Sequence, residues 1–157
     1  VYIVSQGFTG SGGSGTRNSQ LLLPMLEKIG IKPKIELLDR AVWTKRRNSG
    51  DFDMYDEAWI ADLDPDETLY PEWHSGKPWN FVGYNSPEFD KLVSDAQDTL
   101  NQAVRKKLYY KAEDILMADA PLAVLAHMKV FKILHKRVQG FQYIPVDLLN
   151  LHSVWLS

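Results

Sequence analysis

Acidic side chains are concentrated in one short segment, from Asp62 to Glu67 around Pro65. Asp62 comes directly after Ala61 and three residues after Trp59, at the end of an apolar run that predicts a strand. In open α/β sheets ligands bind at the carboxyl ends of the strands. A carboxylate there can hold an ammonium group through a charge-assisted hydrogen bond. The pattern therefore predicts that Trp59, Ala61 and Asp62 contact a ligand.

The same acidic segment does not match a calcium-binding loop. An EF-hand loop that began at Asp62 would need Gly at its sixth position and Glu at its twelfth. Those positions hold Glu67 and Trp73. Asp64 and Asp66 are instead typical of a solvated turn, in which Asp66 caps a short helix that ends at residue 70. No metal ion is expected.

An aromatic-rich loop follows the acidic turn and carries Trp73, His74, Trp79, Asn80 and Phe81. Loops of this kind carry function more often than core, and tryptophan rings stack on peptide side chains and on sugars alike. Trp73 and Trp79 are predicted either at a ligand or interlobe face or as plugs at the edge of the domain, with Asn80 as a further ligand contact. Phe81 is expected to be a plug, and His74 a hydrogen-bonded structural residue.

A glycine-rich stretch offers a different chemistry. Gly10, Gly12 and Gly15 match the G-x-G-x-x-G pattern of dinucleotide-binding folds between an expected strand and an expected helix. However, several residues separate the strand from the first glycine, and Asp39 lies farther away than the usual ~20 residues for the ribose-binding acid. The other positions hold only Ser and Gly, which is typical of a flexible linker. Residues 8–16 are therefore predicted to be a linker or an engineered joint, with a dinucleotide-binding enzyme fragment as the alternative.

Composition excludes several classes of protein. The 157 residues are the length of a single domain, here 1–157. A formal net charge of −2 gives no electrostatic reason to expect nucleic acid or an anionic membrane as a partner. Cysteine is absent, and no apolar run approaches the 18 residues of a transmembrane helix. No G-x-S-x-G follows a strand. Neither an enzyme nor a bound cofactor is expected.

Strands and helices are expected to alternate along the chain, which predicts an α/β fold with a mixed, mainly parallel sheet flanked by helices. Apolar and β-branched runs predict strands over 2–5, 35–38, 54–59, 122–127 and 130–134. Cap and stop signals predict helices over 21–29, after Asp39, after Ser86 and between Asn101 and Pro121. Pro24 predicts a kink or a late start in the first helix.

Five segments of the chain carry patterns that recur in a known family. They are LEKIGIKPKIELLD at 26–39, GDFDMYDEAWIADLDPDE at 50–67, NFVGYNSPEFDKL at 80–92, RKKLYYKAEDILMADAPLAVLAH at 105–127 and VQGFQYIPVDLLNLHSVWL at 138–156. In this order and spacing they resemble the C-terminal lobe of the family 5 extracellular solute-binding proteins of ABC transporters. Members of that family bind oligopeptides, dipeptides, nickel complexes and some oligosaccharides.

The resemblance implies one lobe of a type II periplasmic-binding-protein fold. In peptide-binding members similar to this chain, the Asp of a Trp-x-x-Asp motif binds the free amino group of the ligand. That role carries over to Asp62, three residues after Trp59. Because the Asp64-Pro65-Asp66 motif is general in the family, Asp62 alone does not specify a peptide.

The resemblance also implies partners and a location. Two lobes of such proteins close on a small solute and present it to an ABC permease outside the cytoplasm, in the periplasm or at the cell surface. The N-terminal lobe and any signal peptide are then expected to lie outside this chain, which is predicted to be a monomer with an exposed cleft face. A lone lobe keeps only part of the ligand contacts, so a domain without retained activity is a further alternative.

Overall fold

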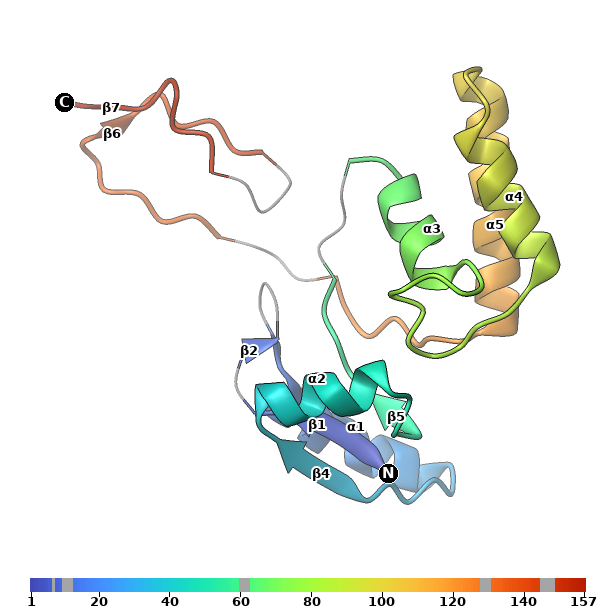
Figure 1. Ribbon diagram of the computed structural model, residues 1–157. Coiled ribbons are helices and arrows are strands. Elements are labelled where there is room, and N and C mark those ends of the chain that lie inside the picture. Colours follow the sequence, from blue (N-terminus) through green and yellow to red (C-terminus); the bar gives the residue numbers. More distant parts are fainter. Residues whose placement is uncertain (7, 10–12, 60–62, 128–130, 145–148) are drawn as a thin grey trace.

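The computed structural model describes residues 1–6, 8–9, 13–59, 63–127, 131–144 and 149–157. Figure 1 shows three parts in chain order. An α/β unit, residues 1–57, comes first. A helical unit, residues 63–120, follows it, and a C-terminal arm, residues 131–157, extends away from both.

A three-stranded parallel sheet with the order β4-β1-β5 forms the centre of the α/β unit. The middle strand, β1 (Tyr2–Ser5), pairs with β4 (Ile35–Leu38) over its whole length. All four residues of β1 are buried, as expected for a central strand of a parallel sheet. The strands predicted over 2–5 and 35–38 are confirmed.

The third strand is shorter than the predicted 54–59, because β5 covers only Met54–Tyr55. The two acidic residues that follow bond to helices instead of continuing along the sheet. Asp56 accepts a hydrogen bond from Asn18 at 3.5 Å, and Glu57 pairs with Arg47. Beyond Tyr55 the chain therefore bonds to side chains of the neighbouring helices and no longer pairs with β1.

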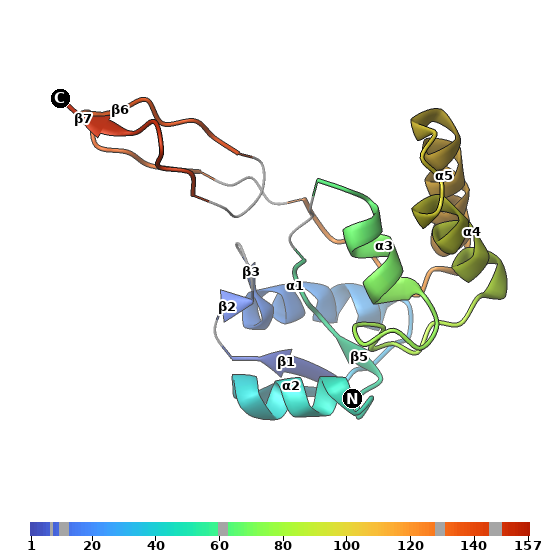
Figure 2. The ribbon, with the colours of Figure 1, turned by 45° about the horizontal axis from the view of Figure 1, so that its top comes forward.

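Helices α1 (Gly15–Lys28) and α2 (Arg40–Asn48) lie on opposite faces of this sheet (Figure 2). The Asp39 carboxylate accepts from two backbone N–H groups in the first turn of α2, which confirms the predicted cap. Pro24 lies inside α1, so the predicted late start is wrong. Gly30 has φ +84°, a conformation that favours glycine, and follows the end of α1 as predicted.

The ends of the glycine-rich stretch pair with each other. Strand β2 (Phe8–Thr9) is antiparallel to β3 (Gly13–Ser14), and α1 begins at the next residue. Gly10 and Gly12, on which the dinucleotide pattern depends, lie outside the described residues. The linker, or joint, over 8–16 stays a prediction.

The helical unit consists of α3 (Asp66–Trp73), α4 (Pro87–Gln97) and α5 (Gln102–Asp119). Ser86 and Asn101 cap α4 and α5 with their side chains, as predicted. Helices α4 and α5 pack side by side (Figures 1 and 2). Their shared core consists of the buried side chains of Phe89, Val93, Ala96, Tyr109, Ala112 and Leu116.

The chain after α5 differs from the sequence prediction. Within the described residues of 122–127 and 130–134 there is no strand, and Ile133 is 95% exposed. Strands β6 (Val138–Gln139) and β7 (Trp155–Leu156) pair with each other in an antiparallel hairpin. Apolar runs form strands only where a neighbouring strand accepts their hydrogen bonds, and the described part of the chain offers none at 122–127 or 131–134. Across the described residues, no helix has both the length and the apolar content needed to cross a membrane.

Candidate functional site

Two tryptophans that flank the acidic turn in the sequence form a ring pair. The ring centroids of Trp59 and Trp79 lie 5.1 Å apart with an interplanar angle of 57°. The two residues are 40% and 45% exposed. Ala61 and Asp62, which were predicted to contact a ligand beside Trp59, lie outside the described residues. The structure therefore brings together two of the predicted site residues as a half-exposed aromatic surface.

Trp73 does not join this pair. Its ring packs edge-on against Tyr84 with 6.4 Å between centroids, and it lies at the rim of the α4–α5 core. This is the arrangement of an edge plug, one of the two alternatives for Trp73. A contact between Trp73 and a ligand stays a prediction.

The side-chain amide of Asn80 organises the aromatic loop. Its nitrogen donates to the carbonyl oxygens of Tyr84, His74 and Trp73 at 2.7, 3.2 and 3.4 Å. Its oxygen accepts from the backbone N–H of Tyr84 at 2.9 Å. Both polar atoms of the amide are thus engaged by the loop that carries Trp79. A direct contact between Asn80 and a ligand stays a prediction.

His74 and Phe81 have structural contacts, as expected. The Nδ1 atom of His74 bonds to the carbonyl oxygen of Ser75 at 2.9 Å, and Nε2 lies 3.4 Å from Ser94 Oγ. The guanidinium of Arg47 lies 3.9 Å from the centre of the Phe81 ring. Because Arg47 belongs to α2, this contact joins the aromatic loop to the α/β unit.

A pair of half-buried carboxylates lies at the same junction and was not predicted. Burial raises the pKa of Glu57 even though Arg47 and Arg40 pair with it. Burial, and then the charge of Glu57, raise the pKa of Glu72 to about 8. Glu72 Oε1 is buried, and the described residues supply no hydrogen-bond donor to it. Glu57 lies beyond the end of β5 and Glu72 lies on α3, so only the folded chain brings them close enough to interact.

The acidic turn is more tightly held than the predicted solvated turn. Helix α3 begins at Asp66 and extends to Trp73, past the predicted end at residue 70. Asp66 is not its cap: the Asp64 carboxylate instead accepts from the Asp66 N–H at 2.9 Å. Asp64 also forms a two-point ion pair with Arg105, which lowers the pKa of the Asp64 carboxyl. A carboxylate with two such partners is structural. Because Arg105 lies far from Asp64 in the sequence, the sequence alone suggests a solvated turn.

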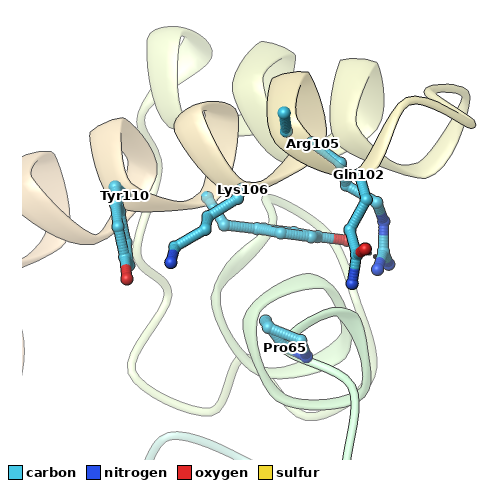
Figure 3. Close-up of a pocket in the computed structure, with 7 residues that line it drawn as sticks. Pro65, Gln102, Arg105, Lys106 and Tyr110 are labelled. Carbon is cyan, nitrogen blue, oxygen red and sulfur yellow. Dashed lines mark hydrogen bonds between the residues drawn. The ribbon is translucent and has the colours of Figure 1, made fainter.

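A pocket of about 590 Å³ opens beside this ion pair (Figure 3). Figure 3 shows Pro65 across from α5, with Arg105 and Gln102 near one end of the pocket and Tyr110 toward the other. None of the predicted ligand-contact residues lines it. Among the described residues, no group of three or more His, Asp or Glu side chains is arranged to hold a metal ion.

Known proteins are similar to this chain in sequence and in fold. A profile of the bacterial extracellular solute-binding proteins, family 5 middle, matches residues 8–81. Di/tripeptide-binding protein 1 of Pseudomonas aeruginosa strain UCBPP-PA14 is 34% identical over 149 residues, which are 87% of this chain and 27% of that protein. The chain thus spans about a quarter of the length of the curated relatives it matches.

Solved structures have a similar fold over 99% of this chain. HbpA2 from Haemophilus parasuis has a TM-score of 0.83 at 26% identity, over 99% of this chain and 32% of that one. The periplasmic binding protein DppA from Helicobacter pylori, in complex with the peptide STSA, has a TM-score of 0.76 at 27% identity, over 99% of this chain and 30% of that one. The chain therefore belongs to the family 5 extracellular solute-binding proteins and has the fold of one lobe of a type II periplasmic binding protein.

Proposed function

We propose that this chain is one lobe of a protein that binds a small peptide outside the cytoplasm and delivers it to an ABC permease, without enzymatic chemistry. The observation that carries the proposal is the half-exposed pair of Trp59 and Trp79. The two residues flank the acidic turn in the sequence of a chain whose relatives include a di/tripeptide-binding protein. Aromatic surfaces of this kind suit the varied side chains of short peptides.

Five of the six predicted site residues have a part in this proposal, and Trp73 is left at the rim of the α4–α5 core. Asp62 holds the peptide ammonium group by a charge-assisted hydrogen bond. Trp59 and Trp79 cover the first side chains of the peptide, and Ala61 is a further contact with it. Asn80 acts by shaping the loop, in agreement with its four hydrogen bonds to Tyr84, His74 and Trp73.

The proposed site needs a second lobe to be complete. Tryptophans at 40% and 45% exposure leave a bound peptide open to water on one side. Ligand pockets usually bury most of the ligand surface, and hinge closure of two lobes around the ligand supplies the missing cover. We propose the N-terminal lobe of the same protein as that cover, and a monomer as the working form.

Asp62→Asn tests the proposed ammonium site, because it keeps the shape of the side chain and removes its charge. Truncating one partner of a buried ion pair costs about 2–5 kcal/mol, so the affinity of the two-lobed protein for a tripeptide should fall at least about tenfold. The urea midpoint of unfolding should stay the same. Equal affinity in both proteins would remove Asp62 from the site, and an unfolded variant would make Asp62 structural.

The dinucleotide alternative is tested separately by titrating NADH and following its fluorescence. We expect no saturable change, because several residues separate the strand at 2–5 from Gly10, whereas the dinucleotide pattern places its first glycine in a tight turn directly after the strand. A saturable change that is lost on Gly12→Ala would favour the alternative.

A further inference from the structure

The guanidinium of Arg105 bonds to three different parts of the helical unit. Its two Nη atoms donate to the two carboxylate oxygens of Asp64 at 2.8 and 2.7 Å. Its Nε donates to the carbonyl oxygen of Ala96 in the last turn of α4, at 3.2 Å. One Nη also donates to the hydroxyl of Tyr109 at 2.9 Å. A planar fork of N–H donors can make all of these bonds at once.

A second set of hydrogen bonds holds the carboxylate of Asp66, two residues after Asp64 in the same turn. The hydroxyl of Tyr109 donates to one carboxylate oxygen of Asp66 at 3.0 Å. The amide of Gln97 donates to the other oxygen at 2.9 Å. Both carboxylates of the Asp64-Pro65-Asp66 motif are therefore fixed to side chains of α4 and α5.

The Arg105–Asp64 pair is too exposed to contribute much to the global free energy of unfolding. The two side chains are 27% and 45% exposed, and ion pairs near the surface contribute about 0–1 kcal/mol. A two-point guanidinium–carboxylate pair nevertheless fixes both the distance and the angle between its partners. Its main effect is therefore on the position of the chain at Asp64.

We propose that Arg105 is a positioning residue for the ligand site: through Asp64 it fixes the chain where the acidic turn enters α3. The inference rests on the proposed function, because it takes Asp62, two residues before Asp64, as the ligand anchor. Arg105 comes 41 positions later in the sequence, on a helix that carries none of the predicted ligand contacts. Its effect on binding is indirect and passes through the backbone at Asp64.

Two substitutions separate geometry from charge. Arg105→Gln removes the fork and the charge, whereas Arg105→Lys keeps the charge. A single ammonium group cannot bond both oxygens of Asp64 together with Ala96 and Tyr109. We therefore expect both variants to release the turn, and Arg105→Lys not to restore it.

Amide hydrogen exchange of the 157-residue chain without ligand measures this directly. The backbone N–H of Asp66 bonds to the Asp64 carboxylate and reports its position. In both variants that amide should exchange about tenfold faster, while amides of the α4–α5 core keep their protection. Lys91→Gln is the matched control, because it removes an exposed ion pair to Asp95 in the same unit and should leave Asp66 unchanged.

Each other outcome contradicts the proposal. Uniformly faster exchange over α4 and α5 would make Arg105 a residue of general stability. Wild-type exchange at Asp66 in Arg105→Lys would mean that charge alone suffices. Should the Arg105 variants fail to fold, Asp64→Asn changes the other partner of the ion pair, and its amide exchange is measured in the same way.

Peptide affinity of the same variants, in the two-lobed protein, separates this inference from the proposed function. We expect affinity to fall about tenfold in Arg105→Gln and Arg105→Lys. A wild-type protein that binds no peptide would contradict the proposed function. Normal affinity in a variant with fast exchange at Asp66 would contradict the role of Arg105 alone.

Discussion

Replacing Glu72 by Gln should stabilise the protein at pH 8 and have little effect at pH 5. Burial and the neighbouring charge of Glu57 raise the pKa of Glu72 from an ordinary 4.5 to about 8. In the unfolded chain the carboxyl loses its proton near pH 4.5, while in the folded chain it keeps the proton up to about pH 8. Folding must therefore hold a proton that the unfolded state has released, and stability falls as the pH rises through this window.

The magnitude follows from the size of the pKa difference. Each unit of pKa is about 1.4 kcal/mol of differential interaction, which must be discounted because Glu72 is only partly buried. We expect a penalty on the order of 1–3 kcal/mol above pH 8 and almost none below pH 4.5. Gln has nearly the same shape and no proton to lose, so the variant lacks the penalty.

Urea unfolding followed by tryptophan fluorescence, at pH 5 and pH 8, measures the difference. The gap in free energy of unfolding between Glu72→Gln and the wild type should widen from near zero to about 1–3 kcal/mol. Glu113→Gln, at an exposed position of α5, is the control and should show no such widening. A gap that is the same at both pH values, or a variant less stable than the wild type at pH 8, would refute the reasoning.

Four further substitutions test other parts of the structure. Asn80→Ala removes four hydrogen bonds in the aromatic loop and should lower the free energy of unfolding by about 1–3 kcal/mol in urea titrations; an unchanged midpoint would contradict that role. Trp59→Phe and Trp79→Phe should each abolish the same near-ultraviolet circular dichroism band, because rings 5.1 Å apart couple, whereas additive losses would mean that the rings are independent. Gly140→Ala places a methyl carbon in steric clash with the carbonyl oxygen of Ser153, at a φ of +73° that favours glycine. It should unpair β6 from β7, seen as faster exchange of their amides, and unchanged protection there would count against the hairpin.

The features that could be predicted from sequence are those that neighbouring residues determine. Asp39, Ser86 and Asn101 cap their helices because a short polar side chain reaches the N–H groups of the next turn. The strand at residues 2–5 has apolar residues buried on both faces. These local signals sufficed to predict the α/β class.

The features that were missed depend on residues far apart in the chain. The bonds between Asp64 and Arg105 join residues 41 positions apart, so the turn reads as solvated from its composition alone. Glu57 and Glu72 lie in different parts of the sequence and interact only once the chain has folded. The strand predicted over 122–127 failed for a related reason, since periodicity describes a segment and not its partner.

The proposed site, formed by the exposed tryptophan pair and the acidic turn, binds a peptide through its free amino group. Calorimetric titration of the two-lobed protein with a tripeptide and with its N-acetylated form tests this most directly. We expect saturable binding of the free-amine peptide, and affinity at least about tenfold weaker for the acetylated form, which has no ammonium group to pair with Asp62. Equal affinity for the two forms, or no binding of either by a folded protein, would contradict it.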